Sequence, residues 1–130
     1  MEEEFALIVE DDQDLAIIFA TALRETGFKT QIVRAGDTAQ KWISSSTPQV
    51  VILDLHLPRV SGKELLEQIR ADERLDDTRV IITTADPRLA EMLQDQADLV
   101  LIKPIGFSQL RDLAARLSQN TQVDTGGMLV

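Results

Sequence analysis

The sequence predicts an α/β fold, a doubly wound parallel sheet of five strands with five helices on its two faces. Two observations support this prediction. Short apolar runs alternate with longer segments in which apolar residues recur every three or four positions, as they do along one face of a helix. The connections between these segments are short, so each strand reaches the next through a helix. Such strands are parallel and their crossovers are right-handed.

The first half of the chain contains two strand–helix units. Residues 5–9 form an apolar run typical of a central strand. An amphipathic helix begins near Leu15 and ends at Gly27, because glycine commonly follows the last turn of a helix. Residues 30–33 predict a second strand and residues 38–45 a second helix.

The third strand is the centre of the predicted sheet. Its apolar run, residues 50–53, is unbroken, which is typical of a strand that is buried on both faces, and it ends in Asp54. A carboxylate at the carboxyl end of such a strand lies where open α/β sheets bind their ligands. Ser61 and Glu64 match a capping box, which predicts the start of the third helix.

The second half repeats the pattern. Residues 72–79 are a polar connection, and residues 80–83 predict a fourth strand. The sequence Asp86-Pro87 predicts a helix start, with the aspartate as N-cap, and this helix extends to about Gln96. A fifth strand follows at residues 99–102.

A last helix closes the domain, which we place at residues 1–118. Ser108 is its predicted N-cap. Its predicted inward-facing residues are Leu110, Leu113, Ala114 and Leu117. Residues 119–130 are mostly polar or glycine and are expected to form a tail or the stub of a linker.

Composition restricts the possible functions. The net charge is -9, so the overall field repels nucleic acid and anionic membranes, and we expect direct binding to neither. The sequence contains no cysteine, which excludes disulfides, thiolate metal sites and a cysteine nucleophile. Its N-terminal apolar run is too short for a signal peptide or a membrane span. These features predict a cytosolic protein.

Polar residues follow four of the five predicted strands, at the edge of the sheet where parallel strands end together. They are Glu10, Asp11, Asp54, Thr83, Thr84 and Lys103. If the first and third strands are neighbours, three carboxylates converge, and their repulsion favours a shared proton or a bound divalent cation. Hard oxygen ligands favour Mg²⁺. A carboxylate nucleophile, Mg²⁺, a hydroxyl and a lysine together predict phosphoryl-transfer chemistry.

Four segments in this order, each at a strand end, carry a resemblance to a known family. They read LIVEDD, LDLHLPRVSG, ITTA and LIKP. On these segments the chain resembles the response-regulator receiver domains of two-component signalling, over residues 5–118. The resemblance implies a flavodoxin-like sheet with strand order 2-1-3-4-5. It also implies a cis peptide bond between Lys103 and Pro104.

The resemblance further implies a magnesium site. Asp11 would ligate Mg²⁺ directly, and Glu10 would do so directly or through water. Asp54 and the backbone carbonyl of His56 would supply further ligands. An alternative is that the acidic run Glu10–Asp12 is only a solvated segment. We accept this alternative for Asp12, which is well placed to cap the first helix, and reject it for Asp11.

The implied chemistry centres on Asp54, which would accept a phosphoryl group from a phosphohistidine or a small phosphodonor. Lys103 would pair with Asp54 before the reaction and with a phosphoryl oxygen after it. Thr84 would donate a hydrogen bond to the phosphoryl group. Because strand alternation directs only one of two adjacent side chains toward a site, we expect Thr83 to be structural.

Four other positions have competing interpretations. The resemblance implies that His56 and Asp86 tune the lifetime of the phosphoryl group. A zinc site at His56 is disfavoured because it is the only histidine, and Asp86 is equally well explained as a helix cap. Val100 occupies the position where the family usually has an aromatic switch residue. The helical spacing of Trp42 from its apolar neighbours indicates core packing.

We consider three functions. The first is a phosphorylatable receiver that takes its phosphoryl group from a sensor histidine kinase or phosphotransfer protein and acts through a downstream protein or as a homodimer. Such a domain is not a turnover enzyme. The second is a docking module that no longer depends on phosphate. Only Val100 supports it, and the complete set of site residues argues against it: Glu10, Asp11, Asp54, Thr84 and Lys103. The third is a phosphatase with an aspartyl-phosphate intermediate, which is disfavoured because His56 stands where a general acid is needed.

Overall fold

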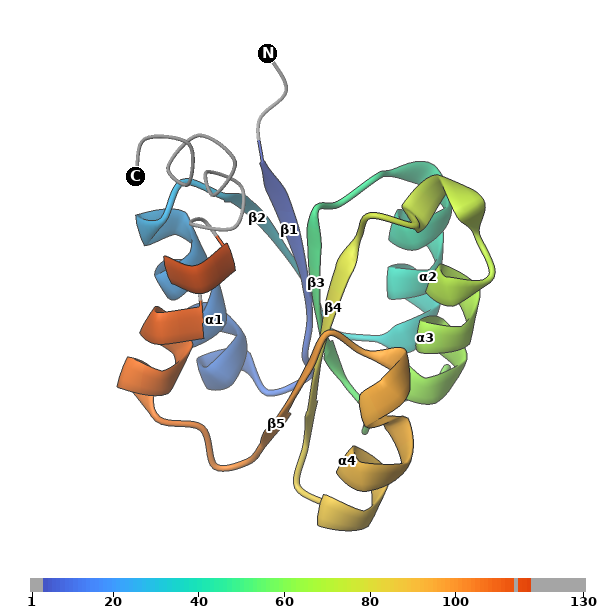
Figure 1. The fold of residues 1–130 in the computed structure, drawn as a ribbon. Coiled ribbons are helices and arrows are strands. Elements are labelled where there is room, and N and C mark those ends of the chain that lie inside the picture. The colour runs from blue at the N-terminus through green and yellow to red at the C-terminus, as the bar shows by residue number, and fades with distance from the viewer. Residues whose placement is uncertain (1–3, 114, 118–130) are drawn as a thin grey trace, which may run out of the picture.

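The computed structural model describes residues 4–113 and 115–117, which form one parallel sheet with helices on both faces (Figure 1). The order of the strands is β2-β1-β3-β4-β5, as the sequence and the resemblance predict. The strands are β1 (Phe5–Val9), β2 (Lys29–Val33), β3 (Val50–Asp54), β4 (Arg79–Thr84) and β5 (Leu99–Ile102). Figure 1 labels four α-helices, which are α1 (Gln13–Glu25), α2 (Gly36–Ser45), α3 (Gly62–Arg70) and α4 (Pro87–Leu93).

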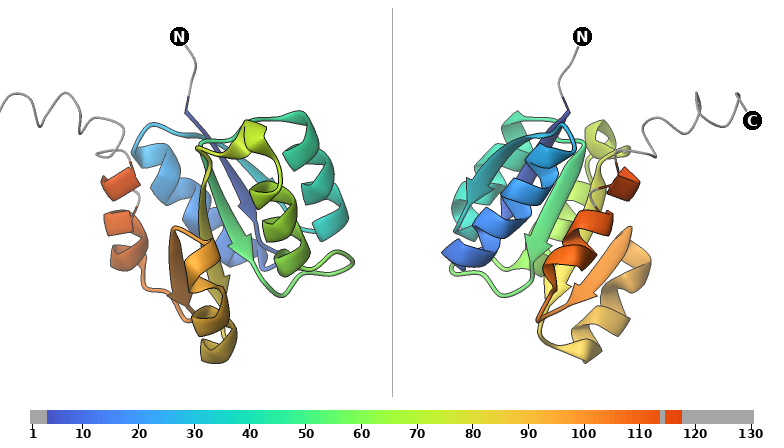
Figure 2. Two further views of the ribbon diagram at one scale, coloured as in Figure 1. Left: turned by 45° about the vertical axis from the view of Figure 1, so that its right-hand side comes forward. Right: turned by 90° about the vertical axis from the view of Figure 1, so that its left-hand side faces the viewer.

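A fifth helix, the C-terminal helix, includes residues 107–113 and 115–117. It lies beside α1 on one face of the sheet, whereas α2, α3 and α4 cover the other face (Figures 1 and 2). Alternate strand residues therefore contribute to two cores. Ile8 and Ile52 pack with α1 and the C-terminal helix, and Leu7 and Leu53 pack with α2 and α3. The β3 strand is buried along its whole length because both of its faces are covered.

The predicted helix boundaries are largely confirmed by their caps. The side chains of Asp12, Ser61 and Asp86 accept hydrogen bonds from the first turns of α1, α3 and α4 at 3.1, 3.2 and 2.9 Å. The α1 helix ends before Gly27, whose φ of 102° favours glycine over residues with a side chain. Capping thus explains why these helices begin and end where they do.

The prediction for the start of the last helix is wrong. The helix begins at residue 107, so Ser108 lies inside its first turn and is not the N-cap. The amide of Leu110 donates to the carbonyl of Gly106 at 3.2 Å, one turn earlier. A cap contributes only about 1 kcal/mol, and burying the leucines of this helix against the sheet contributes more. Leu110, Leu113 and Leu117 are buried as predicted.

The connection predicted over residues 72–79 contains more structure than expected. A short 3-10 helix, η1 (Glu73–Leu75), buries Leu75, and β4 already begins at Arg79. The helix predicted to extend to Gln96 ends as an α-helix at Leu93 and continues as a 3-10 turn, η2 (Gln94–Gln96). Ala114 and residues 119–130 lie outside the described residues, so their predicted roles stay predictions. Within the described residues, no helix is long and apolar enough to span a membrane.

Candidate functional site

The polar residues at the strand ends meet at the carboxyl edge of the sheet. The β1 and β3 strands are direct neighbours, with Val9 opposite Leu53 in their register. Glu10 therefore follows β1 close to the point where Asp54 ends β3. This pairing satisfies the condition on which the prediction of converging carboxylates depended.

Three carboxylates form the acidic cluster of the site. Glu10, Asp11 and Asp54 each place an oxygen within 4.8 Å of the others. Glu10 and Asp54 are almost completely buried, at 0% and 1% exposure, whereas Asp11 is exposed. A cluster of hard oxygen donors with one open side could hold a divalent cation, and its retained waters would face the solvent.

Glu10 shows the electrostatic cost of this arrangement. Burial, and then the hydrogen bond to Asp54 and its negative charge, raise the pKa of Glu10 from 4.5 to about 7, although Lys103 and the amide of Asp12 act in the opposite direction. Without a metal ion, the cluster thus retains a proton near neutral pH. A bound cation would replace that proton and relieve the same repulsion.

Lys103 connects the two buried carboxylates. Its Nζ lies 3.3 Å from Asp54 Oδ2 and 3.1 Å from Glu10 Oε1, and it donates to Glu10 Oε2 at 3.3 Å. Burial lowers the pKa of Lys103, but the two carboxylates outweigh that effect and raise it overall. The ammonium is therefore held charged beside Asp54. The Lys103–Pro104 peptide bond is cis, as the resemblance implied.

The loop after β3 orients the other oxygen of Asp54. The backbone amide of His56 donates to Asp54 Oδ1 at 3.0 Å, and the amide of Leu55 donates to the carbonyl of Thr83 at 3.1 Å. The loop then turns back at Gly62, where a Cβ atom would lie only 2.3 Å from the carbonyl oxygen of Asp54. Only glycine fits at this position without displacing the backbone that carries the carboxylate.

The two threonines at the end of β4 have different environments. Thr84 Oγ1 accepts a hydrogen bond from the amide of Asp86 at 3.0 Å and lies 3.2 Å from His56 Nε2. Thr83 is paired with Asp54 in the register of β3 and β4 and is fully buried, but its hydroxyl has no hydrogen-bond partner among the described residues. The hydroxyl of Thr84 is therefore the one connected to the loops around the site.

Arg34 belongs to the site, although the sequence did not indicate it. Its Nη2 and Nε donate to the carbonyl of Asp11 at 3.0 and 3.3 Å, and its Nη1 donates to Gln13 Oε1 at 3.4 Å. The guanidinium thus ties the start of α1 to the end of β2. The one available signal was its position directly after a predicted strand, at the same edge of the sheet.

Three further predicted positions are explained by packing or capping. Val100 is partly buried against the core under α2, α3 and α4. Trp42 packs against the same core, with its ring centroid 6.0 Å from that of Phe5, which confirms the packing interpretation. Asp86 caps α4, as one of its two interpretations required.

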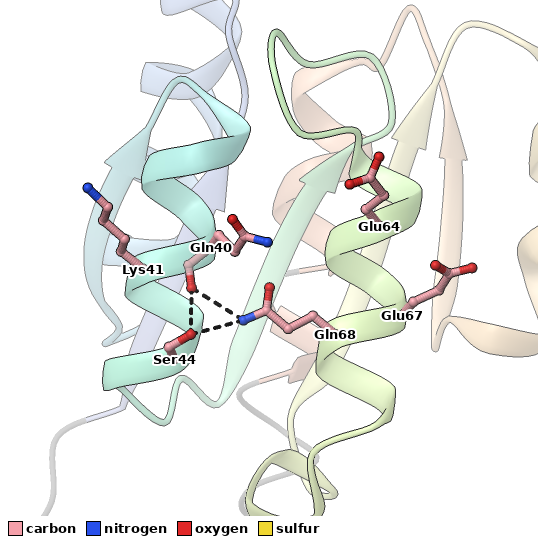
Figure 3. Close-up of a pocket in the computed structure, with 6 residues that line it drawn as sticks. All are labelled: Gln40, Lys41, Ser44, Glu64, Glu67 and Gln68. Atoms are coloured by element: carbon pink, nitrogen blue, oxygen red, sulfur yellow. Dashed lines mark hydrogen bonds between the residues drawn. The ribbon is translucent and has the colours of Figure 1, made fainter.

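A wide surface depression of about 860 Å³ lies away from this chemistry, between α2 and α3 (Figure 3). Its lining consists of Gln40, Lys41, Ser44, Glu64, Glu67 and Gln68. Gln68 crosses it and donates to the carbonyl of Gln40 at 3.3 Å and to Ser44 Oγ at 3.1 Å. The depression contains none of the acidic cluster, so its size does not identify a functional site.

The fold and the site together define a class of signalling domain, in which one carboxylate at the edge of a parallel sheet is surrounded by acidic residues and a lysine. A family model described as the response regulator receiver domain matches residues 6–115. The chain therefore belongs to the response regulator receiver domains of two-component systems. Such domains are signalling domains rather than turnover enzymes.

Individual relatives agree with this assignment. The chain is 34% identical over 116 residues to "Probable methanogenesis regulatory protein FilR2" of Methanothrix harundinacea, covering 81% of this chain and 75% of that protein. It is 29% identical over 123 residues to the response regulator MprA of Mycolicibacterium vanbaalenii, covering 92% of this chain and 52% of that protein. The chain thus spans only about half the length of some curated relatives that it matches.

A solved structure shows the same fold. The CheY-like response regulator receiver domain from Methylobacillus flagellatus superposes with a TM-score of 0.76 at 29% identity, and the match covers 89% of this chain and 99% of that chain. This similarity, together with the family match, explains why the strand order agrees with the resemblance seen in the sequence.

Proposed function

We propose that this chain is a phosphorylatable receiver in which Asp54 accepts a phosphoryl group in a Mg²⁺-dependent reaction. The observation that carries the proposal is the orientation of one buried carboxylate by two opposed groups. The His56 amide holds Oδ1, and the Lys103 ammonium lies beside Oδ2. This arrangement fixes the direction from which Asp54 can attack, and it places a positive charge where a phosphoryl oxygen would arrive.

The acidic cluster fits a magnesium ion. Glu10, Asp11 and Asp54 supply carboxylate oxygens, and we propose the backbone carbonyl of His56 as a further ligand. When bound, the ion would neutralise phosphoryl oxygens during the transfer. Burial, and then the neighbouring Asp54, raise the pKa of Glu10, so a bound cation would offset the cost of ionising this carboxyl.

The residues of the chain have distinct tasks in the transfer. A carboxylate oxygen of Asp54 attacks phosphorus while the bond to the donor nitrogen or oxygen breaks, and the bonding electrons leave with the donor. Lys103 then pairs with a phosphoryl oxygen in place of the carboxylate oxygen. The hydroxyl of Thr84 donates a hydrogen bond to another phosphoryl oxygen. Water later attacks the aspartyl phosphate slowly, which resets the domain.

The partners follow from the family. Response regulators act with histidine kinases and downstream effectors, and we propose that this chain receives its phosphoryl group from a sensor histidine kinase or phosphotransfer protein. Its output would be a downstream protein or a homodimer. We propose that this exchange occurs in the cytosol, without direct contact with nucleic acid or membrane, as the acidic composition led us to expect.

Incubation with acetyl phosphate and Mg²⁺, followed by intact-mass measurement, tests the proposal. We expect the mass to increase by one phosphoryl group, and Asp54→Asn to abolish this increase. Omitting Mg²⁺ should also abolish it. Asp72→Asn changes the carboxylate that caps η1, before the start of β4 and not at its carboxyl end. It is the matched control and should be modified like the wild type. An unmodified wild-type mass would instead favour a docking module that works without phosphate, the function that Val100 suggests.

A further inference from the structure

The side chain of His56 contacts the hydroxyl that should bind the phosphoryl group. His56 Nε2 lies 3.2 Å from Thr84 Oγ1, and this contact joins the loop after β3 to the end of β4. The imidazole is exposed, whereas Thr84 is fully buried. An exposed ring therefore reaches inward to a buried hydroxyl beside the acidic cluster.

The hydroxyl of Thr84 is already engaged on two sides. A threonine hydroxyl has one hydrogen to donate and two lone pairs that accept. The amide of Asp86 occupies one lone pair at 3.0 Å, and the His56 ring is the second partner. The described residues include no hydrogen bond between Thr84 and Asp54. Where His56 Nε2 is the unprotonated nitrogen and accepts the hydroxyl hydrogen, Thr84 must turn that hydrogen away from His56 before it can donate to a group bound on Asp54.

His56 is connected to Asp54 as well as to Thr84. Its backbone amide donates to Asp54 Oδ1 at 3.0 Å, so one residue contacts the carboxylate through its backbone and the hydroxyl through its side chain. The backbone of this loop is anchored, because the amide of Gly36 donates to the carbonyl of Pro58 at 3.2 Å and Gly62 packs on the backbone of Asp54. Because the ring of His56 is exposed, it can turn toward the solvent without a change in this backbone.

We propose that His56 is a positioning residue that holds Thr84 before phosphorylation and releases it when the phosphoryl group arrives. The released ring then changes the surface between the β3–α3 and β4–α4 loops. In this chain, where β5 carries Val100 and no aromatic residue, the His56 ring is the side chain that reports the state of Asp54. This inference rests on the proposed phosphorylation of Asp54 and adds a residue and a readout to it.

The sole histidine makes a direct spectroscopic test possible. In a long-range ¹H–¹⁵N spectrum the imidazole nitrogens of His56 are the only such signals. We would record them at one fixed pH, with Mg²⁺, before and after adding beryllium fluoride as a phosphoryl mimic. We expect the Nε2 resonance to shift on binding. Thr84→Val without the mimic should shift Nε2 in the same direction, because it removes the same partner.

Two variants of His56 test the energetic consequence. His56→Phe keeps a ring but cannot bond to Thr84, whereas His56→Gln keeps a group that can. One net hydrogen bond corresponds to roughly a two- to tenfold change in affinity, so we expect His56→Phe to bind beryllium fluoride tighter by about that factor. His56→Gln should return to within about twofold of the wild type. Measuring mimic affinity avoids effects of the variants on hydrolysis by water.

The outcomes separate this inference from the proposed function. If acetyl phosphate modifies Asp54 but the Nε2 resonance is the same in wild type, Thr84→Val and the mimic-bound protein, the inference is wrong and the proposed function stands. Equal mimic affinities for the wild type and His56→Phe would overturn it as well. If Asp54 is not modified and the mimic does not bind, both fail together.

Discussion

The ammonium of Lys103 lies 3.3 Å from Asp54 Oδ2, which joins the end of β5 to the end of β3 across the intervening strand β4. The same ammonium lies 3.1 Å from Glu10 Oε1 at the end of β1. One lysine thus balances two buried carboxylates from different strands. This relationship determines the electrostatics of the resting site, and it places the ammonium where the proposed phosphoryl group would arrive.

Replacing Lys103 by methionine should abolish phosphorylation by acetyl phosphate and destabilise the fold. The apolar stem is retained, but two buried carboxylates lose their cation. Removing one partner of a buried pair typically costs about 3–5 kcal/mol, and we expect about 1–3 kcal/mol here because Lys103 is 23% exposed. Urea denaturation measures the change. Lys63→Met on the exposed face of α3 is the control, and an equal effect of both substitutions would contradict the prediction.

The stability of the metal-free protein should fall as the pH rises toward 8. The pKa of Glu10 is raised from 4.5 to about 7 in the folded state, so the folded protein binds this proton more tightly than the unfolded chain. The resulting stabilisation is complete below about pH 4.5 and is lost as the pH rises to about 7. Between about pH 5.5 and 8 the free energy of unfolding should decrease by about 2 kcal/mol.

Urea midpoints across this pH range test that dependence. Glu10→Gln removes the titrating group, so its midpoints should change much less between these pH values. Saturating Mg²⁺ should reverse the trend for the wild type, because cation and proton compete for the same carboxylates. A wild-type stability that rises with pH in the absence of Mg²⁺ is the contrary result.

Replacing Arg34 by lysine should weaken Mg²⁺ binding by about fivefold. Lysine keeps the charge but cannot make the paired hydrogen bonds to the Asp11 carbonyl, at 3.0 and 3.3 Å, that hold the segment carrying two proposed ligands. A loss of about 1 kcal/mol in the free energy of Mg²⁺ binding, because the ligands are held less well, corresponds to that factor. Isothermal titration calorimetry with Mg²⁺ provides the measurement. Arg24→Lys, exposed on α1, should bind like the wild type, and equal affinity of Arg34→Lys would show that Arg34 does not position the site.

Gly62→Ala should damage the site and the fold together. Its new Cβ would lie 2.3 Å from the carbonyl oxygen of Asp54, so the loop or the end of β3 must shift. We expect a loss of about 1–3 kcal/mol in stability and slower phosphorylation of Asp54. Gly106→Ala is the matched control, since nothing lies within 4 Å of the Cβ position there. Similar unfolding midpoints for the two variants would contradict the close approach.

Thr83→Val and Thr84→Val should have opposite consequences. The hydroxyl of Thr83 is buried without a partner among the described residues, so valine should increase stability by about 1 kcal/mol and leave phosphorylation intact. Thr84→Val removes a hydroxyl that bonds to the Asp86 amide, and it should impair acceptance of the phosphoryl group. Thermal unfolding and acetyl phosphate labelling distinguish the two. Impaired labelling in Thr83→Val would assign the hydroxyls the other way.

Local patterns in the sequence were sufficient for most elements of the fold. Strands and helices differ in their hydrophobic period, and Asp12, Ser61 and Asp86 are caps whose effect acts within one helical turn. The prediction was wrong at Ser108, where packing of the last helix outweighs a cap of about 1 kcal/mol. Boundaries thus depend on tertiary packing wherever the local preference is weak.

Residue types and their order were sufficient to predict the family, the strand order that its resemblance implies, and the acidic, hydroxyl and lysine residues at the strand ends. These properties depend on residue type and on order along the chain. Three contacts became visible only in the folded structure: Lys103 pairs with Glu10 as well as with Asp54, Arg34 binds the Asp11 carbonyl, and His56 contacts Thr84. Such contacts join residues that are distant in the chain. Their geometry is set by the sheet register and by the loops packed above it, which no local pattern encodes.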